Sequence, residues 1–234
     1  MLILRSELVT RALFENRAVR GFLGAVPGLD AYAVLGKAWW HTTELSNGRP
    51  RYDLVILDGP ASGHAALMLR IPGAILAAMP KGPLARDANA LQDLLHDPAR
   101  TALLIVTLAE ELPARESVEL VTTARRTLGL PLGPLVINAV PSEALAAPPL
   151  AVLLDRLPTV DDAEARTGGD AALWATLRLA ASAAAHRRVA EGIVARLRLD
   201  TGLPVVTLPR LPAVDLGPEA IGELVRHLIS QGVG

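Results

Sequence analysis

The chain has 234 residues, and 51% of them are hydrophobic, which is enough to bury a sizeable core. Its 23 basic and 24 acidic residues nearly cancel, which excludes the basic field that drives nonspecific nucleic-acid binding. The absence of cysteine excludes disulfide bridges and thiolate metal sites.

The longest apolar stretch without a charged residue runs from Ile71 to Met79 and contains a proline and a glycine. A bilayer span needs about 20 apolar residues, so we expect no transmembrane segment. No signal peptide is evident, which favours a cytoplasmic location. Nucleic acid is not expected as a partner.

The first 48 residues are predicted to be mostly helical, with a break at Val26-Pro27-Gly28 and a second helix from Asp30 to about Leu45. Trp39 and Trp40 lie on that helix. Adjacent helix positions point in different directions, so one indole is expected in the core and the other is available for an interface. The next four residues, Asn47-Gly48-Arg49-Pro50, predict a turn.

Four apolar runs are predicted to be strands of a parallel sheet. They do not alternate with polar residues, which is typical of strands buried on both faces. The four runs are Leu54–Leu57, Ala102–Leu108, Leu135–Ile137 and Val205–Leu208.

Between the second and third runs, Pro113 is expected to open a helix that ends at Gly129, with acidic residues early and arginines late. Strand, helix and strand at this spacing predict a right-handed parallel crossover. Two further helices are expected at Asp170–Arg198 and Pro218–Ile229, and Ala144–Pro149 is read as a surface connection.

The segment Tyr52–His64, YDLVILDGPASGH, places Asp58 after an apolar run and before a Gly/Ser turn. Nucleotide-hydrolysing α/β domains hold the water shell of Mg²⁺ with such an aspartate, and they cradle the phosphates with a separate G-x-x-x-x-G-K-[ST] loop. The two lysines of the chain, Lys37 and Lys81, lack that loop's spacing. No phosphate loop is therefore encoded.

Simpler interpretations stay open for these residues. A strand-ending aspartate such as Asp58 often only caps the next helix. Ser62 lacks the two flanking glycines of a hydrolase nucleophile elbow, because Pro60 and His64 stand there. The histidines at 41, 96, 186 and 227 are scattered and do not form a metal-binding pattern.

The fifteen residues from Asp58 to Pro72, DGPASGHAALMLRIP, resemble the switch II region of the anion-transporting ATPase family. This family includes the arsenite-pump ATPase and the ATPase that targets tail-anchored membrane proteins. Three further segments resemble its bacterial branch: GAVPGLDAYAVLGKAWW, KGPLARDANALQDLLHDPART and VTLAEELPARESVEL. The resemblance runs from about Leu2 to Leu228 and leaves out the family's amino-terminal ~100 residues, which carry the phosphate loop.

The resemblance implies ATP and Mg²⁺ as cofactors. By this likeness, Asp58 orders Mg²⁺ through its waters, Gly63 donates its backbone N–H toward the γ-phosphate, and the turn from Gly59 to Ser62 contacts the nucleotide and changes shape on hydrolysis. Asn138 corresponds to the residue whose amide reads adenine, although an Asn that completes a turn is an equal alternative. The loop Pro209–Asp215, with Pro209 and Leu211, corresponds to the adenine-covering loop.

We therefore expect a single α/β domain over residues 1–234. It comprises a mostly helical segment at 1–50 and a doubly wound, P-loop NTPase-like core at 51–234 that is incomplete on its amino-terminal side. Two functions remain open: a truncated or split anion-transporting-type ATPase, or a noncatalytic relative that serves as a binding or regulatory subunit. Without the phosphate-loop lysine the chain alone is expected to be inactive.

Two expectations concern assembly. Leu54–Leu57 is expected to pair directly with Leu103–Leu108, unless Leu2–Leu4 fills the slot between them, because unpaired buried strand edges are costly. The chain is expected to form a homodimer, or a heterodimer with a phosphate-loop-bearing paralogue, and a membrane-protein partner stays open. Trp39, Trp40 and the helix after His64 are the expected contact surfaces.

Overall fold

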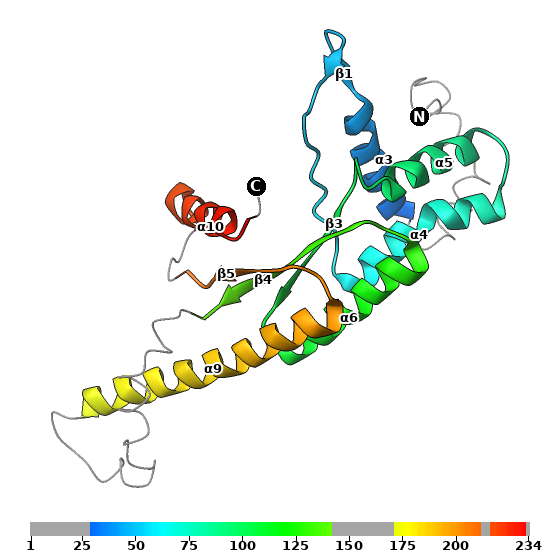
Figure 1. The fold of residues 1–234 in the computed structure, drawn as a ribbon. Coiled ribbons are helices and arrows are strands. Elements are labelled where there is room, and N and C mark those ends of the chain that lie inside the picture. Colours follow the sequence, from blue (N-terminus) through cyan, green and yellow to red (C-terminus); the bar gives the residue numbers. More distant parts are fainter. Residues whose placement is uncertain (1–28, 142–170, 212–215, 233–234) are drawn as a thin grey trace. The chain divides into compact units, whose positions relative to one another are not determined.

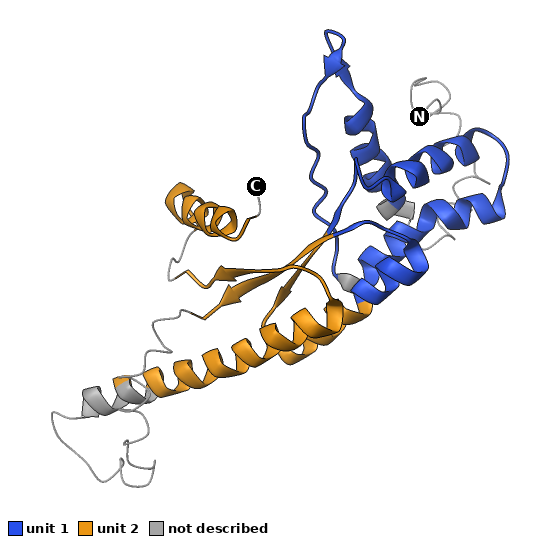
Figure 2. Cartoon of the chain, viewed as in Figure 1, with its two compact units in different colours: residues 1–103, 120–132 blue, residues 104–119, 133–234 orange. Residues whose placement is uncertain are grey.

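The computed structural model describes residues 29–141, 171–211 and 216–232 (Figure 1). These residues fall into two compact units, which Figure 2 distinguishes by colour. Among them, unit 1 holds residues 29–103 and 120–132, and unit 2 holds the remainder. Each unit is described by itself, and the single domain over residues 1–234 stays a prediction. The expectations for residues 1–28, including Leu2–Leu4, and for Ala144–Pro149 lie outside the described residues.

Apart from the helical residues 120–128, the described part of unit 1 contains three helices, α3 (Leu29–Thr43), α4 (Ser62–Ala78) and α5 (Pro83–His96). Each contributes one side chain to a buried cluster made of Leu35, Met68 and Leu91. Trp39 packs against this cluster, which confirms that one of the two indoles anchors the core. Trp40 is half-buried.

The turn after α3 forms as the sequence predicts. Strands β1 (Leu45–Ser46) and β2 (Arg49–Pro50) pair antiparallel around Asn47 and Gly48. Both turn residues have positive φ, 52° and 78°, and Asn-Gly is the dipeptide that accepts this conformation most readily.

The predicted strand at Leu54–Leu57 is wrong. These residues belong to no strand, and the side chains of Leu54 and Ile56 are 74% and 83% exposed. The expected direct pairing with Leu103–Leu108 is also wrong, because residues 54–57 form no strand that could pair with it. An apolar run becomes a strand only when another backbone lies alongside it, and the described residues supply none here.

Unit 2 is built on a parallel sheet, which confirms the predicted fold class. Its strands β3 (Leu103–Leu108), β4 (Leu132–Val140) and β5 (Val205–Pro209) follow the order β3-β4-β5. Leu135 lies beside Val205 and Ile137 beside Thr207 in the parallel ladder of β4 and β5. Side chains of β4 form the centre of this sheet, since Leu135 and Ile137 are fully buried.

Three helices accompany the sheet: α6 (Glu111–Thr123), α9 (Ala171–Thr201) and α10 (Pro218–Ser230). All three were predicted, with α6 continuing into a π-helical segment, η2 (Ala124–Leu128), before Gly129 ends it at a φ of 63°. Helix α9 joins α6 through Arg196 and Glu111, 2.9 Å apart. None of the described helices combines the length and apolarity needed to cross a membrane.

Candidate nucleotide site

Asp58 lies in an extended segment that leads from β2 to α4. Its carboxylate is exposed, and it makes no hydrogen bond or ion pair with any other described residue. The sequence predicted it at the end of a buried strand, and this placement is wrong, because residues 54–57 are unpaired. The same lack of partners leaves both carboxylate oxygens free to meet water or a hydrated cation.

Helix α4 begins at Ser62 with an uncapped end. No side chain caps it at Ala61, and its first turn contains no acidic residue. The first backbone hydrogen bond runs from the N–H of Ala65 to the carbonyl of Ala61, 3.0 Å apart. The N–H groups of the first turn, including that of Gly63, therefore have no partner within the helix and carry its positive dipole end.

Gly63 leaves the space beside this helix end open. A Cβ built on it would meet no atom within 4 Å, so a bulky group can approach the backbone there. An uncapped helix N-terminus with an open approach is a place where phosphate oxygens bind well. The side chain of Ser62 is not among those described.

A metal ion held by protein ligands alone is not supported by the described side chains. No three His, Asp or Glu residues cluster within the described ranges in a way that could chelate an ion. A single carboxylate such as that of Asp58 is compatible with Mg²⁺ bound through water, since Mg²⁺ keeps several waters and uses one or two carboxylates.

Asn138 lies in unit 2 on an irregular stretch of β4. The ladder with β5 shifts register between Ile137 and Val140, and Ala139 has a φ of 54°. The side-chain oxygen of Asn138 accepts a hydrogen bond from the N–H of Ala139 at 2.8 Å. This bond stabilises the bulge, as expected if Asn138 is a structural residue that completes a turn. The side chain is exposed, and its carbonyl oxygen keeps a second lone pair, so binding to a base remains compatible with this bond.

Pro209 is the last residue of β5 and Leu211 lies two residues beyond it, at the same end of the sheet as Asn138, because parallel strands share their carboxyl ends. The N–H of Arg210 donates to the carbonyl of Val140 at 2.8 Å, which ties the end of β5 to the end of β4. The predicted adenine-side residues thus come together in unit 2. Residues 212–215 of the predicted loop lie outside the described residues.

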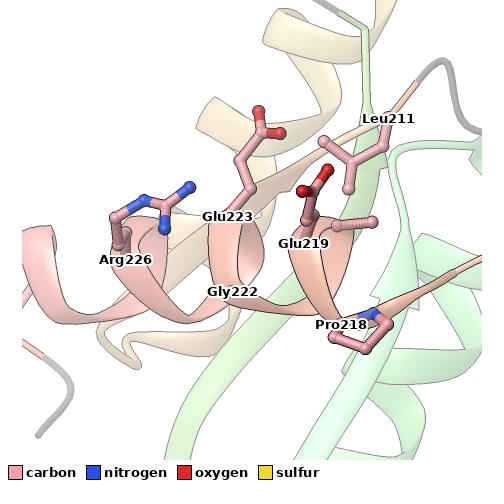
Figure 3. Close-up of a pocket in the computed structure, with 7 residues that line it drawn as sticks. Leu211, Pro218, Glu219, Gly222, Glu223 and Arg226 are labelled. Carbon is pink, nitrogen blue, oxygen red and sulfur yellow. The ribbon is translucent and has the colours of Figure 1, made fainter.

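Leu211 also lines an open pocket of about 660 Å³ against the first turns of α10. Figure 3 shows Leu211 beside Glu219, with the carboxylate of Glu223 on the same side of the helix. Pro218, Ala220, Gly222 and Arg226 complete the lining. Two carboxylates against one guanidinium give this pocket a negative character. It therefore suits the amino and hydroxyl groups of a nucleoside better than its phosphates.

The sequence missed the charged residues of this pocket, Glu219, Glu223 and Arg226. Spacings of three and four residues do place them on one face of the predicted helix Pro218–Ile229. Such a pattern is ordinarily a solvated face, and only the approach of Leu211 turns it into a pocket wall.

The predicted residues fall into two groups, one in each unit. Asp58, Ser62 and Gly63 belong to unit 1, while Asn138, Pro209 and Leu211 belong to unit 2. In unit 1 the group lies within residues 58–63, and in unit 2 the hydrogen bond from Arg210 to Val140 holds the ends of β4 and β5 together.

Comparison with known proteins agrees with a nucleotide site. Over 129 residues the chain is 30% identical to ATPase BagA of Mycobacterium tuberculosis (strain ATCC 25618 / H37Rv), a match that covers 55% of this chain and 37% of the relative. Two further proteins with ATPase in their names, Mb3704 of Mycobacterium bovis and MT3781 of Mycobacterium tuberculosis (strain CDC 1551 / Oshkosh), match to the same extent. No protein-family model matches the chain. The chain is thus similar, over little more than a third of their length, to proteins named ATPases, which supports an ATPase-type protein.

Proposed function

We propose that this chain is the switch-bearing part of an anion-transporting-type ATPase, which acts as a dimer with a phosphate-loop-bearing paralogue or with itself. One observation carries the proposal: the carboxylate of Asp58, which has no partner among the described residues, stands four residues before the open, uncapped N-terminus of α4. These are the two groups that such a switch needs for hydrated Mg²⁺ and for a phosphate oxygen.

Each unit has a part in this proposal. In unit 1, Asp58 holds a water of Mg²⁺, and the N–H of Gly63, beside Ser62, donates to the γ-phosphate. In unit 2, Asn138, Pro209 and Leu211 bind the adenine end, and Glu219 and Glu223 accept hydrogen bonds from amino or hydroxyl groups. The metal and a phosphate-loop lysine would neutralise the charge of the transferring phosphoryl group.

A paralogue is favoured over a second copy of this chain, because neither of the chain's two lysines lies in a phosphate loop. Lys37 lies within α3, and Lys81 lies in the short turn between α4 and α5. Phosphoryl transfer depends almost entirely on positioning and on charge stabilisation. We therefore expect the isolated chain to show no Mg²⁺-dependent ATP hydrolysis above background. We place the activity in the cytoplasm.

The test combines a mixing experiment with a matched pair of variants. ATP turnover is measured for the chain, for a paralogue that carries the G-K-G-G-V-G-K-T segment, and for the mixture. Turnover is expected to rise in the mixture and to fall by about 100-fold in Asp58→Asn. Asp53→Asn, another exposed aspartate of the same segment, is expected to behave as wild type. Turnover by the isolated chain that disappears in Asp58→Asn would contradict the need for a partner.

A noncatalytic binding or regulatory subunit is the second candidate function. The observation in its favour is that the side-chain oxygen of Asn138 already accepts a hydrogen bond within the bulge of β4. In that case ADP binding, turnover and thermal stability of the mixture all remain unchanged by Asp58→Asn.

A further inference from the structure

A second pocket lies within unit 1, between α3 and the extended segment that follows the β1-β2 hairpin. Its volume is about 450 Å³. We call it the α3 groove; its walls include Val34, Lys37 and His41 from α3, and Val55, Ile56 and Leu57 from the segment. The groove is apolar except for two basic side chains.

The backbone beside the groove is available for pairing. Residues 53–57 make no backbone hydrogen bond with any described residue. Leu54 and Ile56 are mostly exposed, while Val55 is half-buried and lines the groove. Among the described residues these N–H and C=O groups have no backbone partner, and such a row with apolar side chains on both faces is a template for an added strand.

Contacts at the start of the segment tie it to α3. The N–H of Arg51 donates to the carbonyl of Glu44 at 2.9 Å, and its guanidinium lies 2.6 Å from the Glu44 carboxylate. That carboxylate also lies 3.1 Å from Nδ1 of His41, whose ring packs edge-on against Tyr52 at 5.2 Å. These contacts hold the neighbouring backbone in place, so a docking chain would lose less free energy in ordering it.

Charge indicates what kind of chain fits. Among the described residues no carboxylate lines the groove, and Lys37 is exposed and makes no ion pair with any of them. Glu44 is already engaged by Arg51 and His41, and these partners hold the pKa of its carboxyl below the ordinary value. A ligand with an acidic group near Lys37 would therefore complement the groove.

We propose that the α3 groove and residues 53–57 form a docking site for an extended, apolar strand of another protein chain, with an acidic side chain facing Lys37. A strand is favoured over a helix or a lipid because an extended backbone can replace water on successive N–H and C=O groups of residues 53–57, which have no backbone partner among the described residues. The inference does not depend on nucleotide binding. It stands on the unpaired backbone, the exposed apolar side chains and the basic lining.

The probe is a fluorescein-labelled ten-residue peptide of alternating valine and threonine with one central glutamate. Matched peptides carry glutamine or lysine at the same place. Fluorescence anisotropy is expected to show the tightest binding for the glutamate peptide. Lys37→Glu should weaken binding of that peptide by about fivefold or more and should strengthen binding of the lysine peptide. Lys81→Glu reverses the charge at the only other lysine of the chain, and it should leave peptide binding unchanged.

Hydrogen exchange and a backbone variant test the pairing itself. Amides of residues 54–57 should exchange rapidly in the chain alone and become protected when the glutamate peptide binds. Ile56→Pro removes one N–H donor at an exposed position, so it should abolish protection without changing the melting temperature.

Three results would overturn the inference. Amides 54–57 that are already protected in the chain alone would mean that this chain or a second copy covers them. Equal binding of the three peptides would show that the groove does not recognise charge. Unaltered binding by Ile56→Pro would show that the peptide does not pair with the backbone of residues 53–57.

Discussion

The side-chain amide of Gln231 takes the place of a neighbouring strand for Thr207. Its oxygen accepts from the Thr207 N–H at 3.0 Å, and its nitrogen donates to the Thr207 carbonyl at 2.8 Å. Thr207 lies on β5, which is an edge strand of the three-stranded sheet. Gln231 therefore closes this edge at one residue and fixes the end of α10 against the sheet.

Replacing Gln231 with leucine should remove both bonds and destabilise unit 2 by about 1 kcal/mol, since an exposed hydrogen bond contributes roughly 0.5–1.5 kcal/mol. Gln231→Glu keeps the acceptor but sets a carboxylate against the Thr207 carbonyl, so it should not restore stability. Urea unfolding and exchange of the Thr207 amide measure the effect. An unchanged Thr207 exchange rate in Gln231→Leu would show that the amide pair is not formed in solution.

Two leucines of α9 provide a matched pair for the packing of unit 2. Leu197 is 1% exposed and Leu199 is 84% exposed, although they are two residues apart on the same helix. Leu197→Ala should cost about 2–5 kcal/mol of unfolding free energy, because it leaves a cavity in the core. Leu199→Ala should stay within about 0.5 kcal/mol of wild type. Chemical denaturation measures the free energy of unfolding of both variants, and equal losses of this free energy would contradict the orientation of α9.

The pH dependence of stability should carry a signal from Tyr32 of α3. Burial and the nearby charge of Asp87 raise the pKa of its phenol to about 12 in the folded chain. The unfolded chain ionises nearer 10, so this contribution to stability is complete below pH 10 and is lost as the pH rises toward 12. Tyrosinate absorbance in Tyr52→Phe, which leaves Tyr32 as the only tyrosine, measures it. Ionisation of the Tyr32 phenol near pH 10 in the folded chain would contradict the burial of Tyr32.

Filling the unit 2 pocket should abolish whatever adenine binding the chain retains. A Cβ at Gly222 meets only the Arg226 guanidinium, at 3.6 Å, so Gly222→Leu adds bulk to the pocket wall without a backbone clash. Gly192→Leu makes the same exchange at an exposed position of α9 and serves as the control. Titration with a fluorescent ADP analogue should show loss of binding in the first variant only. Equal binding by both variants would place the adenine elsewhere.

Local sequence signals were sufficient for most helices and for three strands. Pro113 and Gly129 bounded α6 and its π-helical extension, and the Asn47-Gly48 pair formed the predicted turn. Helices and tight turns satisfy their hydrogen bonds among residues near in sequence, so the chain itself specifies them. Helix α5 was missed, although Pro83 and the apolar spacing at Ala88, Leu91 and Leu94 signalled it.

Contacts between distant residues decided the rest. The apolar run Leu54–Leu57 resembles the other strands in sequence, yet it is unpaired because a strand requires a partner that its own residues do not supply. The sequence predicted Asn138 at the end of a strand. In the structure the register shift against β5 places it in a bulge of β4. The sequence by itself determined which segments are helical, which are apolar and where Asp58 precedes a helix. Only tertiary structure decided which backbone edges are paired, because strand pairing joins residues far apart along the chain. It also decided that Leu211 lines a pocket with Glu219 and Glu223, because local sequence does not set how α10 packs against the end of β5.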